Sequence, residues 1–206
     1  MLMLLATEWA LRGYALEPLA LHARLAVDNA RINGLGDRLT VVSRGVADAH
    51  IEERVELVIA NPPYFAAHDG ALAPEPTRAA SRALQQTTIA AFCKAGARSL
   101  GRGGRMVVAF PAMRAAELLD ALATAALVPK RMRFVHPRAG REAQVVFVEA
   151  KPARAGGLVV EPPLFVRGAG EAYVPAIDAA LRGRWPTPHG VAVIGAVPVV
   201  RSGQPW

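Results

Sequence analysis

The residues best suited to chemistry are Asn61-Pro62-Pro63-Tyr64, which directly follow an apolar run over 55–60. Two consecutive prolines stiffen the backbone and lack N–H donors, so the carbonyls of this turn stay available as acceptors. The side-chain oxygen of Asn61 and the carbonyl of Pro62 could together accept both hydrogens of one planar amino group. Tyr64 adds a ring on which a flat substrate could stack.

The chemistry of such a turn is activation of an amine. Hydrogen bonds from both N–H groups hold the nitrogen and favour its pyramidal form, which frees the lone pair to attack an electrophile. We therefore predict that Asn61, Pro62 and Tyr64 are catalytic residues acting on adenine N6, guanine N2 or a glutamine amide. A bare turn at the end of a strand is the alternative interpretation.

Alternating strands and helices must position this motif. Such alternation predicts an α/β fold with a mainly parallel, doubly wound sheet, in which ligands bind at the carboxyl ends of the strands. The last two strands are separated by a short loop, which favours an antiparallel hairpin at one edge. The apolar runs predict strands over 14–18, 39–42, 55–60, 105–110, 131–135 and 145–149, and helices over 2–11, 19–32, 78–99 and 112–127, with a loop over 66–77.

Length and composition narrow the class of protein. The 206 residues predict one domain over 1–183 and a weakly ordered, Pro/Gly-rich tail over 184–206. With 52% hydrophobic and 20% charged residues, the chain is globular. No apolar run approaches the ~18 residues of a membrane span, so a cytoplasmic protein is expected. A single cysteine, Cys93, excludes an intrachain disulfide, and no residue group has metal-ligand spacing.

The net charge of +7 is concentrated in one segment. Residues 94–141 hold 10 of the 24 basic residues and only 2 of the 17 acidic ones. Such clustering predicts a surface for a polyanion, although an arginine-rich codon bias and an ordinary solvated hairpin are the alternatives. His136 is expected to be structural rather than a general base. The cations predicted to contact RNA are Lys130, Arg131, Arg133, Arg138 and Arg141.

The motif after the apolar strand resembles the fourth motif of the Class I S-adenosylmethionine-dependent amino-methyltransferases. Residues 16–18, 28–35 and 37–38 are similar to the ribose-binding stretch of that class. The segments 136–143, 156–164 and 173–175 resemble the bacterial tRNA1(Val) (adenine-37-N6)-methyltransferases. The resemblance covers about residues 1–183.

This resemblance implies a Class I methyltransferase fold, S-adenosyl-L-methionine as cofactor, and the N6 atom of a tRNA adenine as the methyl acceptor. It implies that Glu17 binds the ribose hydroxyls of the cofactor. Asp48 would contact the cofactor adenine, although the residues directly matching the family's acid are Arg44 and Gly45. A release-factor glutamine methyltransferase and a ribosomal guanine-N2 methyltransferase are alternatives within the same class.

The sequence departs from the family at its start. The family has a strand and a Gly-rich, cofactor-binding turn before the helix that matches residues 2–11, and this sequence opens within that helix. We therefore expect a sheet without its first strand. The absence of the glycine turn leaves enzymatic activity open, and a catalytically inactive remnant or an RNA-binding domain is the alternative of a different class.

Overall fold

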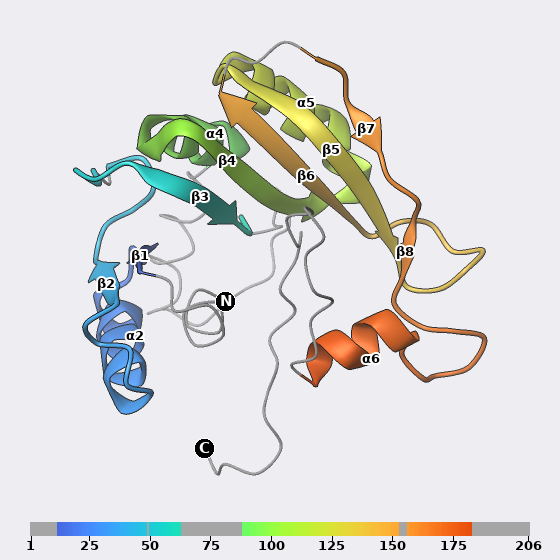
Figure 1. Cartoon of the computed structure of the whole chain (residues 1–206), viewed down its shortest axis with the longest axis horizontal. Coiled ribbons are helices and arrows are strands. Elements are labelled where there is room, and N and C mark those ends of the chain that lie inside the picture. Colours follow the sequence, from blue (N-terminus) through green and yellow to red (C-terminus); the bar gives the residue numbers. More distant parts are fainter. Residues whose placement is uncertain (1–11, 49, 63–87, 153–155, 183–206) are drawn as a thin grey trace, which may run out of the picture.

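The structure, a computed structural model, describes residues 12–48, 50–62, 88–152 and 156–182 (Figure 1). The expected helix over 2–11, the loop over 66–77 and the tail over 184–206 lie outside these residues. The strands are β1 (Gly13–Leu16), β2 (Leu39–Val42), β3 (Val55–Ala60), β4 (Leu100–Pro111), β5 (Leu127–His136), β6 (Val145–Pro152), β7 (Val159–Val160) and β8 (Leu164–Phe165). The helices are α2 (Ala20–Ile32), α4 (Ile89–Ser99), the 3₁₀ turn η1 (Ala112–Arg114), α5 (Ala115–Thr124) and α6 (Pro175–Leu181).

The described strands form two sheets, and the larger one has the order β3-β4-β6-β5-β7, with β8 also paired with β5. β3 and β4 are parallel, whereas β6 is antiparallel to both β4 and β5. β5 therefore runs in the same direction as β3 and β4. The carboxyl ends of these three strands reach the same edge of the sheet as the loop over 137–144, which joins β5 to β6 (Figure 1).

The smaller sheet is the parallel pair β1-β2, in which Tyr14 lies opposite Thr40. Among the described residues, no strand pairs with both β1 and β3. A side-chain contact links the two sheets instead. The Tyr14 hydroxyl hydrogen-bonds to the carboxylate of Glu53, just before β3, and this contact raises the pKa of Tyr14.

One face of the larger sheet packs against α4 and α5. Side chains alternate between the faces of a strand, so every second residue of β4 and β6 points to these helices. The buried cluster on this face contains Met106, Val108 and Phe110 of β4, Val146, Val148 and Ala150 of β6, Ile89 and Cys93 of α4, and Leu118, Ala121 and Leu122 of α5. Burial raises the pKa of the Cys93 thiol to about 12, so this cysteine is an inert packing residue.

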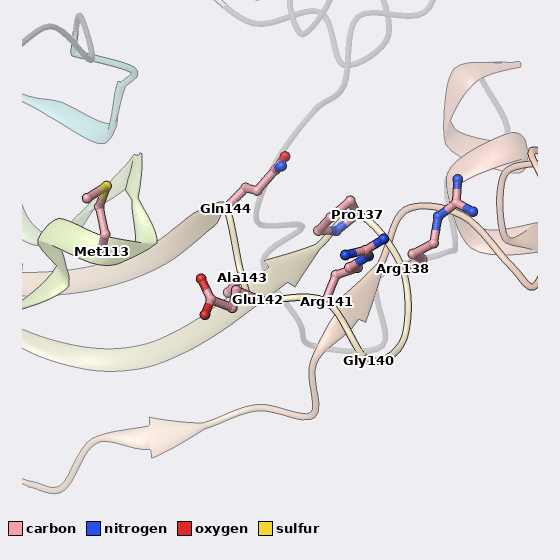
Figure 2. Close-up of a pocket in the computed structure, with 8 residues that line it drawn as sticks. All are labelled: Met113, Pro137, Arg138, Gly140, Arg141, Glu142, Ala143 and Gln144. Atoms are coloured by element: carbon pink, nitrogen blue, oxygen red, sulfur yellow. The ribbon is translucent and has the colours of Figure 1, made fainter.

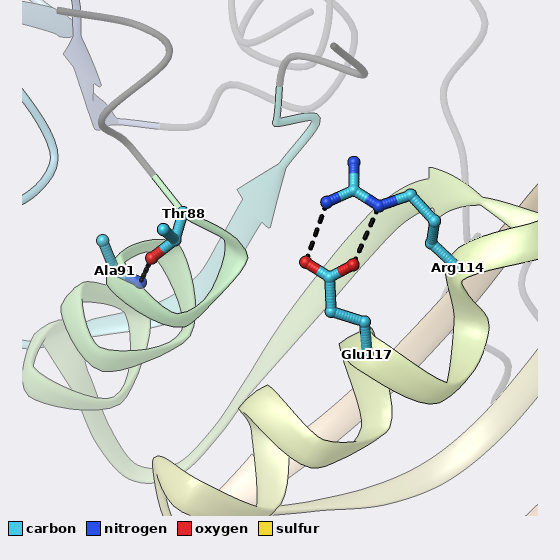
Figure 3. A network of polar contacts seen from close by, with 4 residues as sticks. All are labelled: Thr88, Ala91, Arg114 and Glu117. Atoms are coloured by element: carbon cyan, nitrogen blue, oxygen red, sulfur yellow. Dashed lines mark hydrogen bonds and ion pairs between the residues drawn. The ribbon is translucent and has the colours of Figure 1, made fainter. Parts of the chain in front are cut away.

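The starts of α4 and α5 are stabilised differently (Figure 3). The Thr88 hydroxyl accepts a hydrogen bond from the Ala91 amide at 3.3 Å and so caps α4. Before α5, Arg114 donates two hydrogen bonds of 2.8 Å to the carboxylate of Glu117. The pKa of Arg114 is raised, chiefly by this hydrogen bond. The charge of Arg114 is therefore compensated inside the protein.

The expected helix over 112–127 is shorter in the structure. It consists of η1 and α5 and ends at Thr124, and Leu127 already belongs to β5. The helix stops because Ala126 has a φ of 55°, a left-handed conformation that alanine seldom adopts. β4 begins at Leu100, five residues before the strand expected over 105–110, and it includes Gly103, which has a positive φ of 83°.

Helix α2 is packed through small residues. Its buried side chains are Ala23 and Ala30, and Ala30 joins Leu35 and Leu39 in a second small cluster. The larger apolar residues that predicted this helix, among them Leu21, Leu25 and Ile32, are exposed. The periodicity thus predicted the helix correctly but did not identify the face that packs.

Candidate functional site

Asn61 and Pro62 lie where the sequence places them, at the carboxyl end of β3. The last strand residue, Ala60, is buried and pairs with Val108 of β4, which fixes the position of the turn. The side chain of Asn61 is exposed and Pro62 is buried. Pro62 has no N–H to continue a strand ladder, which explains why β3 ends here. Tyr64 lies outside the described residues.

A hollow of about 1020 Å³ opens at the same edge of the sheet (Figure 2). The loop over 137–144 supplies most of its wall, and Met113, 93% exposed after the end of β4, faces it from another element. β4 and β6 separate β3 from β5, so three strand spacings, or roughly 14 Å, lie between the ends of β3 and β5. The lining residues are Met113, Pro137, Arg138, Gly140, Arg141, Glu142, Ala143 and Gln144.

Backbone contacts fix the loop that forms this hollow. The Nδ1 atom of His136 donates a hydrogen bond of 2.7 Å to the carbonyl of Arg141, and its ring lies 5.6 Å from that of Phe165. The amide of Arg141 donates to the carbonyl of Arg138, and Gly140 between them has a φ of 73°, which favours glycine. His136 thus holds the loop in shape, which agrees with the structural role expected from the sequence.

Three of the five cations predicted to contact RNA, all on β5, contact the segment that follows β6. Arg131 forms an ion pair with Glu161, whose other oxygen lies 3.9 Å from Arg133. Arg133 also donates to the carbonyl of Pro162, and Lys130 to that of Gly156. These contacts attach the segment after β6 to β5. The structure therefore leaves Arg138 and Arg141 as the predicted cations that line the hollow.

Arg138 meets an arginine that the sequence analysis missed. Arg138 donates to Oε1 of Glu171 at 2.7 Å, and a guanidinium nitrogen of Arg167 lies 3.4 Å from Oε2 of the same carboxylate. The pKa of Glu171 is lowered, chiefly by the hydrogen bond from Arg138 and then by the two nearby positive charges. No local pattern marks Arg167 as a neighbour of Arg138, because only the folded chain brings both arginines to the Glu171 carboxylate.

The two predicted cofactor residues belong to the smaller sheet. Glu17 follows β1, and its Oε1 atom accepts a hydrogen bond of 3.0 Å from the Leu19 amide at the start of α2. Asp48 is exposed in a turn after β2, where its amide donates to the carbonyl of Gly45. Because β1 and β2 are parallel, both acids follow carboxyl strand ends.

Within the residue ranges that the structure describes, no three His, Cys, Asp or Glu side chains gather closely enough to hold a metal ion. No helix in the same ranges is both long and apolar enough to cross a membrane.

Solved structures define the fold. A predicted O-methyltransferase from Agrobacterium tumefaciens superposes with a TM-score of 0.66 at 18% identity, over 86% of this chain and 80% of that one. Geranyl diphosphate C-methyltransferase from Streptomyces coelicolor A3(2), in complex with Mg²⁺, geranyl diphosphate and S-adenosyl-L-homocysteine, gives 0.54 at 15% identity, over 74% and 66%. The chain therefore has the Class I methyltransferase fold expected from its sequence.

Curated relatives carry a more particular name. A tRNA1(Val) (adenine(37)-N6)-methyltransferase from Porphyromonas gingivalis is 26% identical over 147 residues, which are 69% of this chain and 56% of that protein. One from Actinobacillus pleuropneumoniae is 43% identical over 42 residues, or 20% of this chain and 18% of that protein. The chain resembles these enzymes and spans about half the length of the first. No family model matches the chain.

Proposed function

We propose that this chain takes part in methyl transfer from S-adenosyl-L-methionine to the N6 atom of an adenine in tRNA. The observation that carries the proposal is the placement of Asn61 and Pro62 at one edge of the sheet with an arginine-lined hollow. A base presented to Asn61 would have its phosphates within reach of Arg138 and Arg141. The name of the curated relatives supports the same substrate.

The proposed role of the turn is to hold the reacting nitrogen. The oxygen of Asn61 would accept one N–H of the adenine amine and the Pro62 carbonyl the other. As the nitrogen begins to bond it gains positive charge, so acceptors already in place stabilise the transition state more than the ground state. Tyr64, four residues after the strand, would stack against the flipped base.

The described residues offer acceptors for part of the cofactor. Bound S-adenosyl-L-methionine would supply an electrophilic methyl group. Glu17 uses Oε1 at the start of α2, and among the described residues its Oε2 has no recorded partner, so this oxygen could accept from ribose hydroxyls. Asp48 is exposed at the neighbouring strand end and would face the adenine. These two hydrogen-bond acceptors fit the hydroxyls of the ribose and the amine of the cofactor adenine.

The experiment that tests the function is transfer of a tritiated methyl group to three acceptors in parallel: bulk tRNA, ribosomal RNA and a release factor. Label is expected in tRNA, at adenine N6 after digestion to nucleosides. Label in release factor alone would overturn the tRNA assignment in favour of a glutamine methyltransferase. Label at guanine N2 of ribosomal RNA would favour the other alternative.

Glu17→Gln is expected to weaken binding of S-adenosylhomocysteine about 10-fold or more, because the ribose hydroxyls lose a charged acceptor. The glutamine oxygen can still accept from the Leu19 amide, so α2 should start normally. Isothermal titration calorimetry measures the affinity, and Glu142→Gln, at the hollow, serves as a charge-matched control. Equal affinities for Glu17→Gln and the unaltered chain would exclude Glu17 from the cofactor site.

A further inference from the structure

We infer that Arg138 and Arg167 form a binding site for one backbone phosphate of the RNA, and that the Glu171 carboxylate occupies this site in the free protein. The inference rests on the proposed function, since it names where the RNA of that function is held. Of the residues in this site, only Arg138 is predicted from the sequence to contact RNA; Arg167 and Glu171 are new. Its ligand is a phosphodiester, which carries one negative charge.

The two guanidinium groups converge because the backbone brings their segments together. The amide of Arg167 donates to the carbonyl of Pro137 at 2.9 Å, directly beside Arg138, and the amide of Val166 donates to the carbonyl of His136 at 2.9 Å. The Arg167 guanidinium lies 4.8 Å above the ring of Tyr173, which restricts its orientation. The site is thus built from β5, its loop and the segment after β8.

Glu171 shows which kind of ligand the site accepts. Its two carboxylate oxygens each face one arginine, at 2.7 Å from Arg138 and 3.4 Å from Arg167. A phosphodiester also carries a single negative charge on two free oxygens, so it can take the place of this carboxylate oxygen for oxygen. The internal contact therefore marks both the charge and the geometry of the external ligand.

The carboxylate is the partner that can leave. Glu171 is 79% exposed, whereas the side chains of Arg138 and Arg167 are 36% and 34% exposed. A solvated carboxylate loses little when it returns to water, since exposed ion pairs contribute only about 0–1 kcal/mol. Arg167 stays in place through the Tyr173 ring and through its hydrogen bond to the backbone carbonyl of Glu171. Displacement of Glu171 by RNA is then an exchange of one anion for another.

The location of the site suits an RNA whose base reaches Asn61. Arg138 lies on the wall of the hollow, beside Arg141, which forms no ion pair with another described residue (Figure 2). The hollow lies at the sheet edge where β3 ends, roughly 14 Å away by strand spacing. A phosphate a few nucleotides from the flipped base would therefore meet Arg138 and Arg167.

The test is binding of end-labelled, unfractionated tRNA, followed by fluorescence anisotropy at several KCl concentrations. Arg167→Ala is expected to weaken binding about 3- to 10-fold and to reduce the salt slope by about 0.7–0.9, as for the loss of one phosphate contact. Glu171→Gln is expected to tighten binding about 2- to 5-fold, because the competing anion is gone. Circular dichroism confirms that each variant is folded.

Matched controls separate this site from a general change of charge. Glu142→Gln removes a carboxylate from the same hollow, but this side chain has no recorded arginine partner among the described residues. In the otherwise unaltered chain, Glu171→Gln should tighten tRNA binding more than Glu142→Gln does. In a chain in which Arg138 and Arg167 are both replaced with alanine, the two glutamine variants should have the same effect. Equal effects of the two glutamine variants in the unaltered chain would overturn the inference.

A competition arm identifies the source of the phosphate. If the site holds a phosphate of the RNA, inorganic phosphate should displace tRNA better than chloride at equal ionic strength, and this difference should be lost in Arg167→Ala. Binding of inorganic phosphate that depends on Arg167, with tRNA affinity unchanged in Arg167→Ala, would assign the site to a free anion and overturn the RNA inference. If Arg167→Ala still methylates tRNA and binds it with unaltered affinity, the phosphate-site inference is refuted and the proposed function stands. Glu171-dependent tRNA binding without any methyl transfer would refute only the proposed function.

Discussion

Replacing Asn61 with alanine is expected to lower the rate of methyl transfer to tRNA by about 10²- to 10³-fold, the usual cost of removing one preorganised group at a developing charge. The side chain is exposed at a strand end fixed by the pairing of Ala60 with Val108, so its removal should leave the fold intact. The effect should fall on kcat, because in the proposed complex Asn61 would contact one nitrogen of a large substrate whose phosphates would bind elsewhere. Steady-state kinetics with tRNA, beside anisotropy for binding, measures both.

Two variants make this prediction specific. Asn33→Ala removes an asparagine whose side chain donates to the Asn29 carbonyl at the end of α2, and it should leave the rate unchanged. Asn61→Asp keeps an acceptor oxygen and should retain more activity than Asn61→Ala. If Asn61→Ala keeps more than a tenth of the unaltered rate, the asparagine does not hold the reacting amine and the turn is only a strand end.

The parts of the fold that the sequence predicted are those with local causes. The apolar runs at β2 and β3 match the predicted strands residue for residue, and the β5–β6 hairpin is antiparallel as expected. The two-residue strands β7 and β8 were not predicted, because they exist only through pairing with the edge of β5. The hairpin is therefore flanked by further chain instead of forming the outermost edge.

The residues of the candidate site also fall into two groups, those with a local sequence pattern and those that only the fold brings together. Asn61 and Pro62 were identifiable because a strand end followed by prolines is a local pattern. The charge count did identify a basic segment, but it did not tell which cations are compensated. Arg138 and Glu171 are 33 residues apart in sequence, and only the fold brings them together. The same holds for Arg131 and Glu161, so the exposed positive surface is smaller than the sequence suggests.

Phe110→Ala is expected to lower the free energy of unfolding by about 3–5 kcal/mol, the usual range for removing a buried aromatic ring. Phe110 is 1% exposed in the main cluster and lies opposite Val146 on β6, between the sheet and α5. The Arg114 guanidinium lies 4.9 Å from the ring centroid, and this contact would also be lost. Urea denaturation followed by circular dichroism measures the change.

The controls for this prediction distinguish loss of packing from loss of any side chain near the end of β4. Phe110→Leu keeps most of the apolar volume and should cost less than about 1.5–2 kcal/mol. Met113→Ala, three residues later and 93% exposed, should change stability by no more than about 0.5 kcal/mol. A change below 1 kcal/mol for Phe110→Ala, on the order of a surface substitution, would mean that this cluster is not the main core. Phe110 anchors the end of β4, which leads into Met113 at the wall of the hollow. Loss of the Phe110 ring should therefore also weaken tRNA binding there. Met113→Ala tests the same wall without loss of stability.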